Sequence, residues 1–310
     1  MTHGFQRYTG AGNTFVVMNT WEDPLSLSRE EMRMFVRKAC DYEEGIGSDG
    51  VILINQPAIS SKSIAEFRMD FYNPDGTTGM LCGNGARCAV AAAREYGFVT
   101  SDAANFEVLG AVNRAEAFTN GNIKVYFQEP SVIRLNFELP LEEGKSIAAN
   151  YVDLGSQHVV VFFNDLSPLL SKEGVGGGKS IEDFNIAHYG PLLRWHPEFA
   201  PVGANANIIE LREDGEDRYL RIRTWERGVE GETLACGTGC MSSAIVARLT
   251  GRIPKTPIRL LTQSGEYVTV DFTVEGNAIS NLSLEGSAIR GEEGMAAFDE
   301  KSGTLEIEYR

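Results

Sequence analysis

The stretch Cys82-Gly-Asn-Gly85 returns 154 residues later as Cys236-Gly-Thr-Gly239. Small, helix-favouring residues follow both stretches, from Ala86 to Ala93 and from Ser242 to Ala247. The pattern therefore predicts a cysteine at the N-terminus of a buried helix in each half of the chain. Unpaired amide N–H groups and the helix dipole at such a position stabilise a thiolate and also bind carboxylate oxygens.

The duplication suggests a chemical use for the two thiols. Taken singly, each cysteine is more simply explained as a small apolar side chain packed in a tight turn. Two equivalent thiols facing one carbon from opposite sides would suit the transfer of a proton across a stereocentre. Because the cysteines occupy matching positions in two similar halves, we favour the catalytic interpretation.

Strand patterns surround both cysteine stretches and predict an α+β (α/β) fold of two similar domains. Each domain is expected to be a mainly antiparallel sheet or barrel around one central helix. A further helix is expected from Ser28 to Ala39, with Ser28 and Glu31 as a capping box. The expected strands span residues 14–19, 51–55, 67–72, 105–109, 122–127, 151–154, 158–163, 206–211, 219–225, 258–261, 267–272, 278–285 and 304–309.

The last of these strands remains after the second repeat, so we expect it to return and complete the first domain. The predicted domains are residues 1–129 with 288–310, which carry Cys82, and residues 130–287, which carry Cys236. A helical excursion is expected from Ser180 to Leu193, and the glycine-rich segment 174–178 is expected to be a surface loop.

Composition narrows the possible partners. The 310 residues carry a net charge of −15 with a pI near 4.8, which argues against binding to nucleic acids or anionic membranes. A small molecule is the expected partner. The chain has five cysteines, an odd number that cannot all form pairs, and it is large enough to be stable without disulfides. Reduced thiols are therefore the favoured interpretation. With no signal pattern or membrane-spanning apolar run, the protein is expected to be cytoplasmic.

Two stretches resemble nucleotide-binding motifs but lack the neighbouring elements or residues that such motifs need. Gly45-Ile-Gly-Ser-Asp-Gly50 satisfies G-x-G-x-x-G, but it precedes an expected strand instead of joining a strand to a helix. Gly178-Lys-Ser180 resembles the end of a phosphate-binding loop, but Glu173 stands where that loop needs a glycine. Neither motif predicts a nucleotide.

Polar residues before each cysteine extend the pattern. The motifs along the chain are Gly10-Ala-Gly-Asn-Thr-Phe15, Gly45–Gly50, Asn73-Pro-Asp-Gly76, Cys82-Gly-Asn-Gly-Ala-Arg-Cys88, His196-Pro197, Asn205-Ala-Asn207, Glu226-Arg-Gly228 and Gly231-Glu-Thr-Leu-Ala-Cys-Gly-Thr-Gly239. Together these motifs resemble the diaminopimelate epimerase family. The resemblance covers nearly the whole chain, and the motifs occur in the family's order.

The resemblance implies a cofactor-independent, metal-free isomerase that converts LL-diaminopimelate to meso-diaminopimelate for lysine and peptidoglycan precursor synthesis. One cysteine, as a thiolate, would remove the α-proton while the other, as a thiol, protonates the opposite face. Cys82 would be assisted by His158, and Cys236 by Glu226. The family's architecture implies a pseudo-two-fold axis and an active site in the cleft between the domains, with a homodimer as a possible assembly.

Substrate contacts also follow from the resemblance. Backbone amides of Gly83, Asn84, Gly237 and Thr238 would bind the reacting carboxylate. The distal amino-acid group would be bound by Asn13, Asn73, Asn205 and Arg227, the last of these suited to a bidentate carboxylate contact. Where the family usually reads Gly-Asn-Pro-His, this chain reads Gly155-Ser-Gln-His158. Ser156 can still donate one hydrogen bond in place of the missing amide.

Three alternatives remain open at this stage. The same scaffold could racemise another amino acid, which Ser156 and Gln157 favour and Arg227 opposes. Cys82, Cys88, Cys236 and Cys240 could bind zinc, although the first pair is spaced more widely than a structural zinc knuckle normally is; we expect Cys88 and Cys240 to be packing residues. A non-catalytic, substrate-binding relative is the third alternative.

Overall fold

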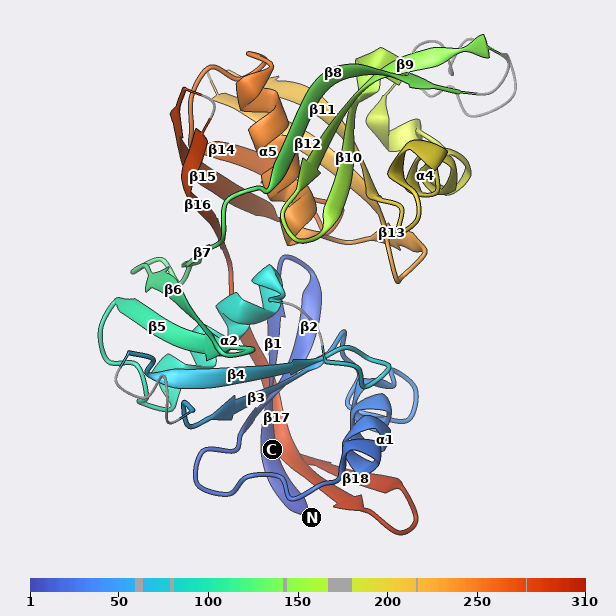
Figure 1. Cartoon of the computed structure of the whole chain (residues 1–310). Coiled ribbons are helices and arrows are strands. Elements are labelled where there is room, and N and C mark those ends of the chain that lie inside the picture. The colour runs from blue at the N-terminus through green and yellow to red at the C-terminus, as the bar shows by residue number, and fades with distance from the viewer. Residues whose placement is uncertain (59–63, 79–80, 142–143, 167–179, 216, 277) are drawn as a thin grey trace. The chain divides into compact units, whose positions relative to one another are not determined.

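The computed structural model describes residues 1–58, 64–78, 81–141, 144–166, 180–215, 217–276 and 278–310. Contacts divide the chain into two compact units (Figure 1). The first unit contains Met1–Tyr126 and Glu285–Arg310, and the second contains Phe127–Leu284. The segment 174–178 and the start of the Gly178-Lys-Ser180 motif lie outside the described residues.

The first unit is one sheet with two helices. Its strands are paired in the order β18-β17-β1-β2-β3-β4-β5-β6-β7, antiparallel except for the parallel pairs β2–β3 and β4–β5. The strands are β1 Thr2–Gly10, β2 Asn13–Asn19, β3 Val51–Asn55, β4 Phe67–Tyr72, β5 Ala103–Val108, β6 Ala111–Ala117, β7 Ile123–Tyr126, β17 Ile289–Asp299 and β18 Thr304–Tyr309. The last strand, β18, lies in this unit, where it pairs with β17.

The helices of the first unit follow from local sequence. Helix α1 (Arg29–Cys40) starts at Ser28 with both bonds of the predicted capping box. Helix α2 (Gly83–Glu95) is rich in alanine and glycine, and these small side chains let it lie against β1, β2, β3, β4, β6 and β7. The prediction of a central buried helix is confirmed, because most of α2 is buried.

The second unit repeats this plan. Its sheet order is β8-β9-β10-β11-β12-β14-β15, with β13 added beside β12, and its parallel pairs are β10–β11 and β12–β14. The strands are β8 Val132–Pro140, β9 Ser146–Asp153, β10 Gln157–Phe162, β11 Asn205–Asp214, β12 Asp217–Glu226, β13 Gly231–Thr233, β14 Ile258–Leu261 and β15 Tyr267–Glu275, followed by β16 Ala278–Gly286, which crosses the boundary between the units.

Helix α5 (Gly237–Leu249) is the counterpart of α2. It lies against β9, β10, β11, β12, β14 and β15, and its residues from Gly239 to Ala247 are buried. The strand β11 begins 154 residues after β3, the same spacing as the two cysteines. A parallel pair of strands therefore precedes each cysteine-capped helix at an equivalent position.

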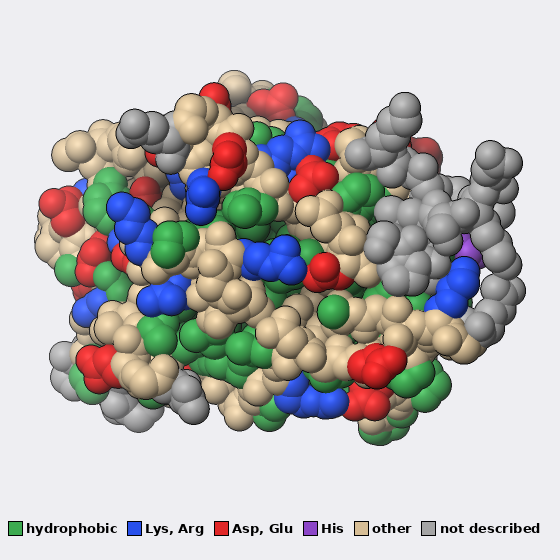
Figure 2. Space-filling model, turned by 90° about the horizontal axis from the view of Figure 1, so that it is seen from above, with side chains coloured by type: hydrophobic (Ala, Val, Ile, Leu, Met, Phe, Trp, Pro, Cys, Tyr) green, Lys and Arg blue, Asp and Glu red, His purple; other side chains and the backbone are tan. Residues whose placement is uncertain are grey.

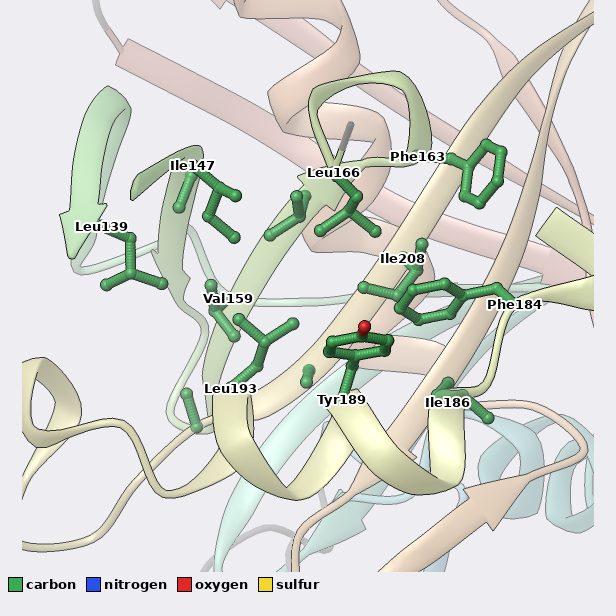
Figure 3. Close-up of a cluster of buried hydrophobic side chains, with 14 of the residues drawn as sticks. Leu139, Ile147, Val159, Phe163, Leu166, Phe184, Ile186, Tyr189, Leu193 and Ile208 are labelled. Carbon is green, nitrogen blue, oxygen red and sulfur yellow. The ribbon is translucent and has the colours of Figure 1, made fainter. Parts of the chain in front are cut away.

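A separate apolar cluster packs under helix α4 (Ile186–Arg194), as Figure 3 shows. Tyr189 and Leu193 point from this helix toward Val159 of β10 and Ile208 of β11. One helix was expected from Ser180 to Leu193. Instead, the chain makes the short 3-10 turn η3 (Ile181–Asp183), and α4 starts only after Asn185, whose side chain caps the His188 amide.

Five strands were missed in the sequence because their patterns are polar or only half-buried. These are β1, β6, β8, β13 and β17, in which few side chains are fully buried. Two short 3-10 turns, η2 (Phe163–Leu166) and η4 (Pro197–Phe199), complete the second unit. His196 caps η4 by accepting a hydrogen bond from the Glu198 amide.

The surface is charged without being segregated. On the face drawn in Figure 2, basic and acidic side chains are interspersed, and the basic ones do not merge into a continuous patch. Within the part of the chain that the structure describes, no helix combines the length and apolar character needed to cross a membrane.

Candidate active site

Cys82 is the N-cap residue of α2, as the sequence predicts. Its backbone is extended (φ −83°, ψ 114°), its carbonyl accepts from Ala86, and its Sγ lies 3.5 Å from the donating Gly85 amide. A Cβ at Gly85 would lie 3.4 Å from both Ile52 Cδ1 and Met69 Cε, so glycine lets this first turn pack tightly on the sheet. The Cys82 thiol thus lies at the N-terminal end of α2, where backbone N–H groups act as donors.

The predicted binding residues of the first unit meet in a hydrogen-bond chain. Asn84 Nδ2 donates to Asn13 Oδ1 at 2.7 Å, and Asn13 Nδ2 donates to Asp49 Oδ2 at 3.3 Å. Asp49 also accepts from the Thr14 amide at 2.9 Å and from the Tyr42 hydroxyl at 3.1 Å. Asp49, which belongs to the rejected glycine motif, therefore orients Asn13 beside the cysteine-capped helix.

Asn73 lies apart from this chain, in the turn after β4. Its Nδ2 donates to Thr77 Oγ1 at 3.0 Å, and its backbone amide donates to the Thr77 carbonyl. Asp75 accepts from the Thr77 amide and hydroxyl, and these bonds lower the pKa of its carboxyl. The turn is thus tied together by its own polar groups.

Cys236 is the N-cap residue of α5 and is only 7% exposed. The Thr238 hydroxyl lies 3.6 Å from its Sγ. Burial, reinforced by the negative charge of Glu226, raises the pKa of the Cys236 thiol well above its usual value, against the opposing bonds from Thr238 and the Gly239 amide. The thiol form is favoured at neutral pH.

Glu226 ends strand β12, where its Oε2 accepts from the Thr233 hydroxyl of β13 at 2.8 Å. Burial raises the pKa of its carboxyl. Because each acid resists ionisation next to the other, Glu226 and Cys236 together hold one negative charge more readily than two. Thr233 is a site residue that the sequence reasoning missed, since a hydroxyl in a short strand carries no distinctive signal.

His158 lies near the start of β10 and is fully buried. Its Nε2 is 2.9 Å from Ser156 Oγ, and its Nδ1 is 3.1 Å from Asn207 Nδ2. Burial, followed by the nearby Arg227 charge, lowers the pKa of His158 to about 3. The ring is therefore neutral across the physiological range.

Arg227 is held by two neighbours in the second unit. Its backbone amide donates to Asn205 Oδ1 at 2.8 Å, and its Nη1 donates to Gln157 Oε1 at 2.6 Å. Asn205 Nδ2 donates in turn to the Gln157 carbonyl at 3.0 Å, and Gln157 Nε2 donates to Asp153 Oδ2 at 3.2 Å. Gln157, treated in the sequence only as a departure from the usual motif, is thus in direct contact with a predicted binding residue.

The predicted site residues therefore form one group in the first unit, from which Asn73 lies apart, and two sets in the second unit. The first unit brings together Cys82, Gly83, Asn84 and Asn13, and the second brings together His158, Ser156, Arg227 and Asn205, and also Cys236, Gly237, Thr238 and Glu226.

The remaining cysteines are structural. Cys88 and Cys240 are buried on α2 and α5, and none of the five cysteines forms a disulfide. Over the described ranges, no three His, Cys, Asp or Glu side chains cluster as a metal site would require.

Comparison with known proteins identifies the family. The family model described as diaminopimelate epimerase matches residues 5–133. A diaminopimelate epimerase of Aquifex aeolicus is 36% identical over 296 residues, which cover 94% of this chain and 96% of that protein. One from Hydrogenobaculum is 31% identical over 94% of this chain and 98% of its own length.

Solved structures share the fold at lower identity. A phenazine biosynthesis protein of the PhzF family from Bacillus anthracis has a TM-score of 0.67 and 18% identity, covering 96% of this chain and all of that one. A hydroxyproline epimerase from Agrobacterium vitis has a TM-score of 0.65 and 17% identity, covering 97% and 94%. The predicted two-domain α+β fold is thereby confirmed, and by its sequence the chain belongs to the diaminopimelate epimerase family.

Proposed function

We propose that this chain is an isomerase that converts LL-diaminopimelate to meso-diaminopimelate without a cofactor, in the synthesis of lysine and peptidoglycan precursors. The observation that carries the proposal is the repeated geometry of Cys82 and Cys236. Each cysteine is the N-cap residue of a buried, glycine-led helix, where amide N–H groups can stabilise a thiolate and a substrate carboxylate together. Epimerisation needs one group to remove the α-proton and another to supply a proton to the opposite face.

The two thiols take these parts in turn. One cysteine, as a thiolate, removes the α-proton, and the other, as a thiol, returns a proton from the opposite face, so the charge of the pair is conserved over the turnover. The raised pKa of Cys236 makes it the proton donor in the resting protein. For the reverse direction Cys236 must lose its proton, and Glu226 is the partner that assists this loss.

Substrate binding is divided between helix termini and side chains. The amides of Gly83, Asn84, Gly237 and Thr238 hold the reacting carboxylate, where negative charge builds up during proton removal. The distal amino-acid group binds to Asn13, Asn73, Ser156, Asn205 and Arg227. The guanidinium of Arg227 has donors beyond the Nη1–H that bonds Gln157, so it can still bind a carboxylate.

The small-molecule substrate is consistent with the acidic chain. We further propose that the enzyme works in the cytoplasm, as a homodimer, without nucleic-acid or membrane partners. Light scattering on the purified protein tests the dimer, since a mass near 34 kDa instead of twice that value would contradict it.

Solvent isotope exchange tests the reaction. Under reducing conditions in deuterium oxide, with no added cofactor, the protein should incorporate one deuterium at the α-carbon of LL-diaminopimelate and yield the meso isomer. Proline, hydroxyproline, glutamate and lysine form the comparison panel, because Ser156 leaves open a racemase of another amino acid. Exchange into a panel member but into neither diaminopimelate isomer would contradict the proposed substrate and support that alternative.

A further inference from the structure

Asn207 is a fully buried amide that the proposed reaction leaves without a role. It lies on β11, opposite Val160 of β10 on one side and Thr224 of β12 on the other. A buried amide is tolerated only when its hydrogen-bonding groups are satisfied. The partners of Asn207 therefore reveal what it does.

The hydrogen-bond partners of the Asn207 side chain fix the orientation of its amide group. Asn207 Nδ2 lies 3.0 Å from the Val159 carbonyl and 3.3 Å from the Asn205 carbonyl. Carbonyl oxygens only accept, so the NH2 group has to face them. Asn207 Oδ1 then accepts from the Thr224 hydroxyl at 3.0 Å. Exchanging the two ends would set an oxygen against two carbonyl oxygens.

The same NH2 group lies 3.1 Å from His158 Nδ1. A hydrogen on Nδ1 would point at another donor, so Nδ1 must carry its lone pair toward Asn207, and the hydrogen of the neutral ring must be on Nε2. We propose that Asn207 is a positioning residue that fixes His158 in the Nε2–H tautomer.

Asn207 also touches the second cysteine motif. A Cβ added at Gly239 would overlap Asn207 Oδ1, so the last glycine of Cys236-Gly-Thr-Gly239 is the residue that leaves room for the amide. One side chain thereby connects the β10 histidine, the β12 threonine and the first turn of α5. The glycine that looked like part of a carboxylate-binding turn has a packing reason as well.

The tautomer decides whether His158 Nε2 can accept a proton or only donate a hydrogen bond. Its consequence for the reaction rests on the proposed function. With its hydrogen on Nε2, the ring donates a hydrogen bond to Ser156 Oγ, 2.9 Å away, and has no lone pair there to accept a proton. His158 thus acts at Nε2 as a neutral hydrogen-bond donor and not as a general base. Its strongly lowered pKa agrees with a ring that stays uncharged while doing so.

Nuclear magnetic resonance reads the tautomer directly and without substrate. The chain has four histidines, so ¹⁵N-histidine labelling gives four ring patterns in a two-bond ¹H–¹⁵N correlation spectrum, and His158→Gln identifies one of them. The expected pattern for His158 is Nε2–H, unchanged from pH 8 to pH 5. A pattern of Nδ1–H, of averaged tautomers or of imidazolium in the wild-type protein would overturn the proposal.

Two variants separate positioning from packing. Asn207→Asp puts an acceptor at Nδ1, so His158 should become an Nδ1–H or imidazolium ring at pH 7. Thr224→Val removes a bond at the other end of the amide while the two carbonyls keep the NH2 in place, so the Nε2–H pattern should persist. An unchanged pattern in Asn207→Asp would refute the role of Asn207. If Asn207→Asp does not fold, the ring patterns of the wild-type protein and of Thr224→Val still test the proposed tautomer of His158.

Activity is measured separately. If the wild-type protein has the Nε2–H pattern but causes no exchange at diaminopimelate, the proposed reaction fails and the positioning role stands. If exchange is normal and the pattern is Nδ1–H, the positioning role fails and the proposed reaction stands.

Discussion

The two helices that begin at the cysteines share a backbone plan but differ in how deeply their cysteines are buried. Cys82 is partly exposed, and its Sγ accepts the Gly85 amide with Asn84 and Asn13 nearby. Cys236 is buried beside the carboxyl of Glu226, which helps to raise its thiol pKa. Duplication has therefore preserved the position of each sulfur while its surroundings have diverged. Equivalent backbone positions with different surroundings suit a reaction in which one thiol donates a proton while the other accepts one.

Removing either thiol is expected to have the largest effect. Cys82→Ala and Cys236→Ala should each lower the epimerisation rate by a factor on the order of 10³ or more, because each step of the proton transfer needs its own group. The rate is measured by conversion of LL- to meso-diaminopimelate. Cys88→Ala and Cys240→Ala, changed on the same two helices, are matched controls and should retain activity wherever they fold. Full activity in either single variant of Cys82 or Cys236 would exclude two-thiol chemistry.

Glu226→Gln tests the origin of the raised pKa of Cys236. Loss of the neighbouring negative charge should lower the pKa of Cys236 toward its usual value, while epimerisation falls by roughly 10² because the thiol loses its partner. Peptide-resolved alkylation by iodoacetamide across pH measures the thiol pKa. Glu213→Gln is the control, since Glu213 forms an exposed ion pair with Arg218 at the far end of the same β11–β12 hairpin. A Cys236 profile that did not move would show that burial alone sets its acidity.

The sequence predicts features that depend on local residues and misses those that depend on contacts between distant strands. The duplicated motif predicts both helix N-caps because glycine and small residues act locally. It is silent on Gln157, Asn207 and Thr224, because their roles depend on bonds between strands that lie far apart in the sequence. Strand β8 escaped prediction for a related reason, since most of its residues stay partly exposed and leave little apolar alternation.

His158 makes the second unit sensitive to acid. Its folded pKa of about 3 lies below the unfolded value of 6.5, so the unfolded chain binds the proton first as pH falls. Stability is fully present above pH 6.5 and decreases toward pH 3, by at most about 1.4 kcal/mol per pH unit from this one group. Urea unfolding at pH 7 and pH 5 measures the loss. The loss should be smaller in His158→Gln, and an equal loss in both proteins would assign the acid sensitivity to other groups.

The smallest effect is expected at Gln157, and its sign decides between two roles. In each unit a polar side chain holds a proposed binding residue: Asp49 holds Asn13, and Gln157 holds Arg227. If Gln157 orients the guanidinium, Gln157→Leu should raise the KM for diaminopimelate roughly three- to tenfold with kcat little changed, as expected for one lost hydrogen bond. If Gln157 instead competes with the substrate carboxylate for Arg227, the same change should lower KM.

Gln157→Glu is the comparison variant. A carboxylate at position 157 pairs with Arg227 and competes with the substrate for the guanidinium, so this variant should raise KM under either role. A lower KM in Gln157→Leu alone would therefore identify Gln157 as a competitor.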